Sequence, residues 1–309
     1  MGKVLIITLN YNQSEYTLKC IDSILMSDYD NFSILLIDNG SSEENFSELK
    51  RLLPEDKRII LRRIHENKGY VGGINFGLNC GLQEKPDYFL IMNNDTILDR
   101  NAISALVDTC RDFNNKAIVT GKVFDYDDTN RLQDIGYILK KKWNLSFEHI
   151  GFNEIDCGQY DRVSERDLID DVFWLFPLEL YHEIGGYSPH FWFNSEQADF
   201  ALRAKSVSYK LVYTPYARIW HKGSVSIGGR DQNVKLVFWH IKSTVILRYL
   251  HLPRVNFLLY YLSEVTLLFI SYIKCVFLGD TNKIKRNNAK VKGFHHFNLW
   301  LLQRLKESR

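Results

Sequence analysis

The sequence predicts an α/β fold, a mostly parallel sheet with helices on both faces, followed by a helical C-terminal region. Short β-branched runs alternate with stretches of helical period through the first 125 residues, which is typical of a parallel sheet with crossover helices. The last 80 residues are instead apolar and basic. At 309 residues and 45% hydrophobic content, the chain can bury a sizeable core, which excludes disordered, collagen-like and disulfide-scaffold proteins.

Five strands and four helices are expected in the first 125 residues. The strands are expected at residues 4–9, 33–37, 59–64, 88–92 and 117–123, and the helices at 14–26, 43–53, 71–82 and 101–113. Residues 124–168 show no clear periodicity and form either an acceptor-side insertion or a long connection. Residues 218–231 are rich in Gly and Ser, which predicts a flexible joint between a body, residues 1–229, and a tail, residues 230–309.

The charge of the chain is unevenly distributed. Thirty-nine basic and 37 acidic residues give a net charge of +2, which argues against a dedicated nucleic-acid partner. Residues 230–309 hold 14 basic and four acidic residues, a net charge of +10, so residues 1–229 carry −8.

The five cysteines are widely spaced with no Cys-x-x-Cys pair, and the N-terminal apolar run is short for a secretory signal. Both features predict a reducing, cytoplasmic environment.

Small polar residues follow each of the first four expected strands, in the segments 8–12, 38–42, 66–75 and 93–96. A single such segment is more typical of a capped turn. Ligands of parallel α/β sheets bind at the carboxyl ends of the strands. Four polar segments in succession therefore predict a binding site along that edge.

Two residues are candidate ligands of a divalent cation. Asp95 follows a hydrophobic strand between amide side chains, where it would serve either as a ligand of Mg²⁺ or Mn²⁺ or as a helix cap. His221 follows the strand expected from residue 210. A lone histidine is more often structural, but beside a metal site its imidazole is a suitable ligand.

A helix is expected after the aromatic residues 191–193. Glu196, Asp199 and Arg203 are spaced to share one face of that helix. The pair Asp199–Arg203 is expected to be a surface ion pair, worth about 0.3 to 0.5 kcal/mol if exposed. Glu196, beside the aromatic residues, is suited to remove a proton from a hydroxyl group.

Residues 255–278 form an apolar stretch in which 18 of 24 residues are apolar or aromatic. The length is close to that of a membrane span, but Glu264 and Lys274 interrupt it. The pattern favours helices in the membrane interface, flanked by basic residues that face anionic lipid. A helix pair packed on the body and a homodimer surface are the alternatives. The basic residues are Lys283, Lys285, Arg286, Lys290 and Lys292.

Residues 1–229 resemble family 2 glycosyltransferases of the GT-A fold, closest to the bacterial rhamnosyltransferase-like branch. The motifs that carry the resemblance are Asn10-Tyr11-Asn12, Asp38-Asn39-Gly40-Ser41, residues 67–75, Asn93-Asn94-Asp95-Thr96, Ile184-Gly185-Gly186-Tyr187, Glu196-Gln197-Ala198-Asp199 and Trp220-His221-Lys222-Gly223-Ser224.

The resemblance implies roles for the residues in these motifs. Asp38 would bind the pyrimidine base of a nucleotide-sugar, and Asp95 and His221 would bind Mg²⁺ or Mn²⁺. Trp174 and Trp192 would lie on the acceptor side. The other residues of the nucleotide-sugar pocket would be Thr8, Asn10, Asn12, Asn67, Gly69, Gly72, Gly73, Asn75, Asn93 and Asn94.

The sequence departs from the family pattern at two positions. Asn93 replaces the first carboxylate of the metal motif, which leaves Asp95 as its single carboxylate. Gln197 stands where the family usually has its catalytic carboxylate, and an amide does not accept a proton at neutral pH. Three alternatives follow: Glu196 is the base, Asp199 is the base, or a Glu→Gln change at residue 197 traps substrate.

The implied reaction is inverting sugar transfer from a nucleotide-sugar, best matched by dTDP-rhamnose with UDP-sugars also open. The acceptor would be a polyprenyl-diphosphate-linked glycan at the inner face of the cell membrane, in cell-surface polysaccharide synthesis. A catalytically silent nucleotide- or glycan-binding subunit is the alternative. A nucleotidyltransferase is disfavoured because the segment after the first strand is neither Gly-rich nor basic.

Overall fold

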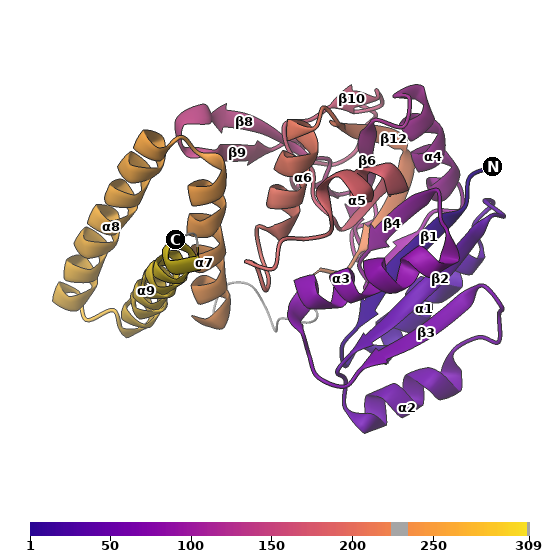
Figure 1. The fold of residues 1–309 in the computed structure, drawn as a ribbon, viewed down its shortest axis with the longest axis horizontal. Helices are drawn as coiled ribbons and strands as arrows, with labels where there is room; N and C mark the ends of the chain where they lie inside the picture. The colour runs from indigo at the N-terminus through magenta and orange to yellow at the C-terminus, as the bar shows by residue number, and fades with distance from the viewer. Residues whose placement is uncertain (224–233, 308–309) are drawn as a thin grey trace.

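The computed structural model describes residues 1–223 and 234–307. It shows a sheet-centred body with long C-terminal helices at one end (Figure 1). The strands are β1 (Val4–Asn10), β2 (Phe32–Asn39), β3 (Ile59–Ile64), β4 (Tyr88–Met92), β5 (Thr96–Leu98), β6 (Ala117–Asp125), β7 (Leu132–Asp134), β8 (Tyr137–Lys141), β9 (Ser146–His149), β10 (Ser164–Glu165), β11 (Phe173–Pro177) and β12 (Lys210–His221). The helices are α1 (Ser14–Leu25), α2 (Glu43–Leu52), α3 (Gly69–Gly81), α4 (Ala102–Asp112), α5 (Leu178–Ile184), α6 (Glu196–Ser206), α7 (Val234–His251), α8 (Arg254–Phe277) and α9 (Thr281–Glu307).

The main sheet has the order β10-β12-β6-β11-β4-β1-β2-β3. The first four strands are parallel, whereas β11 runs antiparallel between β4 and β6. Asn10 pairs with Asp38 in the register of β1 and β2, so the polar residues that follow these strands meet at one edge, as predicted. The expected α/β architecture is confirmed, and the described bounds lie within a few residues of the expected ones.

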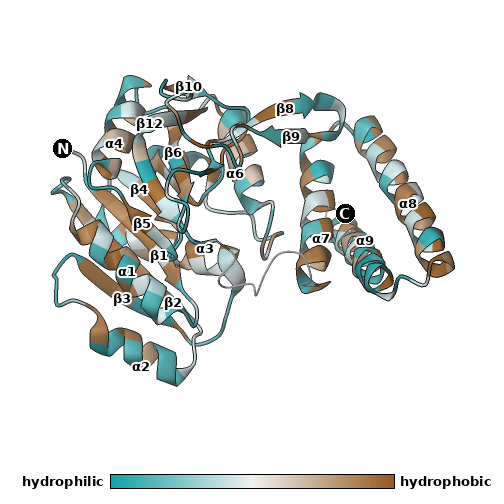
Figure 2. Ribbon diagram, turned by 180° about the vertical axis from the view of Figure 1, so that it is seen from behind, coloured by the Kyte–Doolittle hydropathy of each residue, from teal (hydrophilic) through white to brown (hydrophobic). Residues whose placement is uncertain are grey.

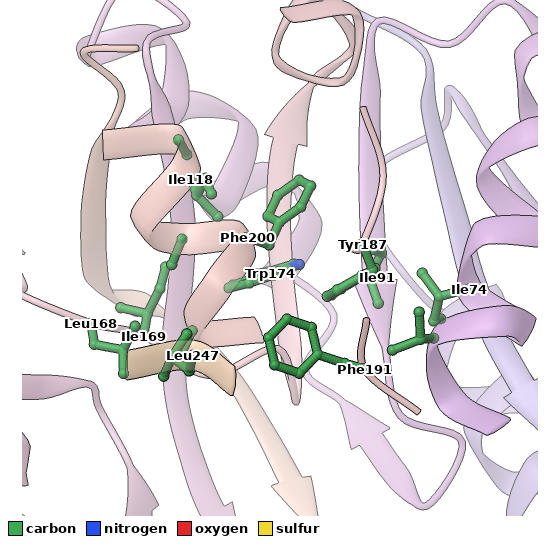
Figure 3. Close-up of a cluster of buried hydrophobic side chains, with 14 of the residues drawn as sticks. Ile74, Ile91, Ile118, Leu168, Ile169, Trp174, Tyr187, Phe191, Phe200 and Leu247 are labelled. Carbon is green, nitrogen blue, oxygen red and sulfur yellow. The ribbon is translucent and has the colours of Figure 1, made fainter. Parts of the chain in front are cut away.

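Alternating strand residues enter two cores, one on each face of the sheet. Leu5 and Ile7 of β1 face the layer of α3, α5 and α6. Val4 and Ile6 face the layer of α1, α2 and α4. Figure 3 shows part of the first core, in which Trp174 and Phe200 lie in one cluster with Leu247 of α7. The tail thus shares a core with the body through α7.

The segment 124–168 is folded rather than a bare connection. It contributes β7 and β10 to the main sheet and forms a separate hairpin of β8 and β9. The tip of the hairpin contacts the tail, because Arg248 Nε of α7 donates to the carbonyl of Asn144 at 2.7 Å. These strands have two to five residues and polar, partly exposed sequences, which explains why periodicity did not reveal them.

The predicted flexible joint overlaps the last strand, β12, so its first residues are not flexible loop residues but strand residues. Residues 218–221 belong to β12, where they pair with both β6 and β5, while residues 224–231 of the joint lie outside the described residues. The register of β12 against β6 shifts between Tyr213 and Arg218. Pro215 lies in this irregular stretch, the position within a strand where the lack of an N–H is tolerated.

The three tail helices differ in how they are covered. Val245 and Ile246 of α7 are fully buried, and Phe294 and Phe297 of α9 join the same core. Helix α8 is long and apolar enough to cross a membrane, and only 11% of its most apolar stretch is buried. The packing of α7 on the body agrees with the alternative prediction that tail helices pack on the body. Helix α8, in contrast, leaves most of its surface exposed.

Candidate active site

A hydrogen-bonded chain of side chains joins three polar strand ends. Asn10 Nδ2 donates to Asp38 Oδ1 at 2.8 Å, Thr17 Oγ1 donates to Asn10 Oδ1 at 2.9 Å, and Asn94 Nδ2 donates to Thr17 Oγ1 at 2.8 Å. Asp38 and Asn10 are fully buried. Thr8 is also fully buried on the same face of β1, and its hydroxyl has no hydrogen-bond partner among the described residues. The edge is therefore rigid and polar before any ligand arrives.

The glycine-rich segment 67–73, which enters α3 at Gly69, is held against the end of β2. Asn39 accepts from the backbone N–H of Lys68 at 3.2 Å and donates to the carbonyl of Gly69 at 3.0 Å. Gly40 adopts φ +81°, and a Cβ there would lie 2.3 Å from the backbone nitrogen of Asn67. A side chain is excluded at this close approach of two backbones. Asn12 similarly accepts from the N–H of Ser42 at 2.9 Å.

Two residues predicted for the pockets have structural roles in the described conformation. Asn75 both accepts from the N–H and donates to the carbonyl of Tyr187, each at 2.8 Å, so its amide is used within the protein. Trp174 is fully buried between the sheet and α6 (Figure 3). Its indole stacks beside Tyr187 and Phe200, because residue 174 of β11 faces the core. The Trp174 side chain is thus not exposed to an acceptor in this conformation, and its acceptor-side role stays a prediction.

Trp192 does lie at the surface of the site, with 41% of its area exposed. Its ring covers the Cα of Gly69, where a Cβ would approach to 2.6 Å. It also stacks on Trp239 of α7 at 5.9 Å between centroids. Trp192 thus connects the glycine-rich loop to the tail. Gly73 of the same loop region allows close packing on Leu9, and Gly72 lies above Lys68 in the first turn of α3.

Asp95 and His221 meet because β5 pairs with β12, in a register that sets His221 opposite Thr96. His221 Nε2 lies 3.2 Å from Asp95 Oδ1, and both side chains are at least nine-tenths buried. Asn93 Nδ2 approaches the same imidazole nitrogen at 3.4 Å. Three polar groups from two distant segments therefore converge at one point of the edge.

The surroundings of His221 assign its tautomer. Gln133 Nε2 donates to Asp125 and to the carbonyl of His221, which turns Gln133 Oε1 toward His221 Nδ1 at 2.9 Å. Nδ1 then carries a proton, and in the neutral imidazole the lone pair of Nε2 faces a carboxylate oxygen. Two acceptor atoms 3.2 Å apart are stabilised by a cation between or beside them. The donor set of one imidazole and one carboxylate fits Mn²⁺ or Mg²⁺.

The described residues contain no group of three or more His, Cys, Asp or Glu placed to hold a metal. Two protein ligands are sufficient where phosphate oxygens and water complete the coordination, as is usual for Mg²⁺ with nucleotides. A metal held by these two residues would therefore bind together with a phosphorylated ligand rather than in a closed structural site.

A buried acidic cluster lies beside the end of β4. The backbone carbonyl of Val172 accepts from the N–H of Asn93 at 2.9 Å, which sets Asp171 next to the polar edge. The hydroxyls of Tyr187 and Tyr70 donate to Asp171 Oδ2 at 2.6 and 2.9 Å. Burial raises the pKa of Asp171, and the charge of Asp170 raises it further.

Glu196 completes this cluster at the start of α6. Burial raises the pKa of Glu196 well above its usual range, and the negative charge of Asp171 raises it further. One carboxylate oxygen of Glu196 has no hydrogen-bond partner among the described residues. Gln197 Oε1 and the Trp174 indole nitrogen are also buried without a partner there. A buried, unpartnered carboxyl with a raised pKa is a typical general base.

Asp199 differs from Glu196 because both of its oxygens are paired. Arg203 Nε donates to Oδ2 and His251 Nε2 lies against Oδ1, each at 2.8 Å. Arg203 also donates to the carbonyls of Ile184 and Gly186 at 2.7 and 2.8 Å. The expected ion pair between Asp199 and Arg203 is present, but its expected surface location is wrong, because Asp199 is 2% exposed. Burial favours a higher pKa, but His251 and Arg203 hold the pKa of Asp199 below its usual value.

Four residues of the site were missed at the sequence level: Gln133, Asp171, Tyr70 and His251. Gln133 lies in the segment without periodicity, and His251 lies in the tail. Asp171 precedes the wholly apolar strand Phe173–Pro177, a short run that would have signalled a buried strand with a polar start. Tyr70 stands inside a motif that was considered for its glycines.

We expect His251→Ala to lower the free energy of unfolding by about 2 kcal/mol, because it removes a hydrogen bond to a buried carboxylate. The measurement is urea unfolding at pH 7. The lowered pKa of Asp199 stabilises the fold above its unfolded pKa, and this contribution is lost as pH falls through the folded pKa. His182→Ala, at an exposed position of α5, is the control. Equal unfolding of the two variants would contradict the role of His251.

Comparisons with known proteins place the chain in a family. The model of the family described as "Glycosyl transferase family 2" matches residues 5–172. The glycosyltransferase GlyG of Streptococcus pneumoniae serotype 4 is 28% identical over 179 residues, 56% of each chain. The poly-beta-1,6-N-acetyl-D-glucosamine synthase of Staphylococcus aureus strain COL is 24% identical over 221 residues, 71% of this chain and 50% of that protein. The chain thus spans about half the length of these relatives.

Two solved structures share the fold at 13% sequence identity. One is GalNAc-T7 with UDP, GalNAc and Mn²⁺, with a TM-score of 0.58 over 77% of this chain and 48% of that one. The other is the mannosyltransferase PcManGT from Pyrobaculum calidifontis with GDP-Man and Mn²⁺, with a TM-score of 0.57 over 97% of this chain and 87% of that one. With a family match over more than half of its length and a GT-A fold, the chain belongs to family 2 of the glycosyltransferases.

Proposed function

We propose that the protein is an inverting, metal-assisted glycosyltransferase that moves a sugar from a nucleoside-diphosphate donor to a hydroxyl group of a lipid-linked glycan. The facing acceptor atoms of Asp95 and His221 carry the proposal, since they call for a cation at the same edge of the sheet as the unpartnered carboxyl of Glu196. A cation that holds a diphosphate, next to a general base, is the arrangement that this reaction needs.

The donor is expected to lie along the rigid strand ends. Asp38 and Asn10 are proposed to recognise the base, and the loop from Asn67 to Gly73 to cover the sugar and ribose. The resemblance to the rhamnosyltransferase-like branch supports dTDP-rhamnose as the donor. The UDP in GalNAc-T7 supports UDP-sugars as the second donor class, since both nucleotides carry a pyrimidine.

The residues of the chain suggest the following transfer step. Glu196 accepts the proton of the acceptor hydroxyl, whose oxygen forms a bond to the anomeric carbon opposite the diphosphate, and the bond to the diphosphate breaks. Attack from the opposite side inverts the configuration. Asp95 and His221 would hold Mg²⁺ or Mn²⁺, which neutralises the departing diphosphate. Asp171 would help Glu196 to hold the proton, because the negative charge of Asp171 raises the pKa of Glu196.

The acceptor is proposed to approach past Trp192, which is the exposed aromatic residue of the loop before α6. We infer that the acceptor is a polyprenyl-diphosphate-linked glycan of cell-surface polysaccharide synthesis, reached from the cytoplasmic face of the membrane. The apolar surface of α8 supports an acceptor in the membrane, and the polysaccharide synthase among the relatives agrees with this role.

A nucleotide- or glycan-binding subunit without turnover is the second candidate. It is favoured by Gln197, whose amide stands where a family member usually has its carboxylate. This candidate predicts donor binding without transfer, so the binding and transfer measurements below distinguish it from the enzyme.

Glu196→Gln is expected to reduce transfer about 10²- to 10⁴-fold, the typical contribution of a general base, while donor binding remains. The measurement is transfer from dTDP- and UDP-sugars, with binding followed by thermal shift. Because burial raises the pKa of Glu196 and the base acts deprotonated, kcat/KM of the native enzyme should rise with pH through that raised pKa. The control is Glu179→Gln, on an exposed position of α5. A fully active E196Q enzyme would exclude Glu196 as the base.

Gln197→Glu tests whether the chain is a substrate-trapping form. If Glu196 is the base, the variant should show no gain in transfer, because a further carboxylate joins an already acidic, buried cluster. Transfer rates of the two proteins under the same conditions decide the matter. A large gain would show that residue 197 is the catalytic position and that the glutamine suppresses activity.

Asp95→Asn is expected to abolish the extra thermal stabilisation that Mn²⁺ gives in the presence of UDP, because binding stabilises the folded state by mass action. Gln133→Leu, which removes the partner of His221, should weaken Mn²⁺ binding roughly 10- to 100-fold. The control is Asp127→Asn, since Asp127 pairs with Lys222 beside the site. If D95N kept the full Mn²⁺ effect, the proposed ligand would be wrong.

A further inference from the structure

Helix α8 presents a continuous apolar face that no described residue covers. Its exposed apolar residues include Phe269, at 65% exposure, and Phe277, at 88%. We call this surface the α8 face, and its members are Val255, Leu258, Leu259, Leu262, Val265, Phe269, Ile270, Ile273, Val276 and Phe277. Figure 2 shows the hydrophobic residues along α8, at the end of the molecule away from the sheet.

The spacing of these residues places them on one side of the helix. They recur at intervals of three and four residues, which is the repeat of a single helical stripe. Glu264 precedes Ile273 by nine residues, about two and a half turns, and so points about 180° away from it. The charge that interrupts the apolar sequence therefore does not interrupt the α8 face.

Basic residues border the C-terminal end of this face. Lys274 is exposed near the end of α8, and Lys283, Lys285 and Arg286 are exposed in the first turns of α9. Asp280, which caps α9 through a hydrogen bond from the N–H of Lys283 at 2.9 Å, is the acidic residue in this stretch. An apolar stripe with a cationic border is the pattern of helices that lie in the interface of anionic membranes.

We propose that the α8 face docks in the plane of an anionic lipid leaflet, with the basic start of α9 on the headgroups. The inference deepens the proposed function, because it specifies how the enzyme would meet a lipid-linked acceptor. The occupant is a bilayer surface rather than a second copy of the chain. A symmetric dimer with parallel α8 helices would bring Lys274 and its basic neighbours toward their own copies, where like charges repel.

Contacts between α8 and α9 favour docking in the plane over a membrane span. Asn287 of α9 donates to Ser271 Oγ at 3.1 Å and to Cys275 Sγ at 3.6 Å. Tyr261 of α8 donates to Asn298 at 3.1 Å. These polar contacts keep α9 beside α8 along much of its length. A spanning α8 would draw the charges of α9 into the hydrocarbon, where they are strongly disfavoured.

Helix α7 connects the docked hairpin to the catalytic loop. Ser243 Oγ of α7 donates to the carbonyl of Phe193 at 3.0 Å, and His251 at its end contacts Asp199. Both contacts lie within three residues of Glu196. Docking of α8 would therefore fix the orientation of the site relative to the membrane through a rigid helix rather than through a flexible link.

Vesicle flotation of the full-length protein tests the proposal. The native protein should float with phosphatidylcholine vesicles that contain phosphatidylglycerol, and less with phosphatidylcholine alone. Combined Leu262→Glu and Phe269→Glu should abolish flotation, and combined Lys285→Glu and Arg286→Glu should weaken it about tenfold or more. Phe152→Glu is the matched control, since Phe152 is 54% exposed on the body and its loss should leave flotation unchanged. Circular dichroism confirms that each variant is folded.

Four results would overturn the proposal. The native protein fails to float with the anionic vesicles, or L262E/F269E floats as well as the native protein. A dimer of the native protein in light scattering that is absent in L262E/F269E, together with no vesicle binding, would assign the α8 face to a second copy. Vesicle-bound protein resists both high salt and alkaline extraction, which assigns α8 to a membrane span. Flotation needs neither donor nor acceptor, so its failure leaves the proposed chemistry to be judged by the E196Q and D95N experiments.

Discussion

The geometry of the site depends on the contacts that the buried carboxylate of Asp199 makes with Arg203 and His251. Through Arg203 it reaches the carbonyls of Ile184 and Gly186, and through His251 it reaches the tail. The turn after Gly186 is in turn held by Asn75 of α3. One ionised group therefore connects α6, the turn after α5, the helix of the glycine-rich loop and α7. Glu196, one turn earlier on α6, inherits its position from these contacts.

This division of roles follows from the electrostatics of two carboxyl groups on one helix. A buried carboxylate is stable when cations or donors pair with it, and such a group has little affinity for a further proton. Asp199 meets that condition. Glu196 instead has an unpartnered oxygen and lies near the negative charge of Asp171. Its affinity for a proton is therefore high. Environments that separate the pKa values of neighbouring carboxyls distinguish a structural group from a catalytic one.

The sequence predicted the parallel half of the sheet and the polar edge, because these depend on local period and on the rule that strand ends share an edge. The meeting of Asp95 with His221 was expected only from the resemblance to the family. The sequence could not predict the buried state of Asp199, since His251 comes from the tail and spacing along α6 alone suggests a surface pair. The internal contacts of Asn75 and the burial of Trp174 were not predicted for a related reason: motif membership does not say which face of an element a side chain occupies. Short edge strands such as β7, which carries Gln133, leave no periodic signal.

The charge split becomes a physical requirement once the dimensions of the tail are considered. Helix α8, with 24 residues, is about 36 Å long, whereas electrostatic interactions at physiological salt are screened over about 8 Å. A membrane in contact with the tail would therefore respond to the basic residues nearest the contact rather than to the net charge of +2. The body, with a charge of −8, would be repelled by the same anionic surface. Helix α7 would reduce this repulsion under the proposed docking, because it lies between the body and α8 (Figure 1). Under the proposed function the acidic body would also repel a diphosphate, so a cation at Asp95 and His221 would be a condition for donor binding.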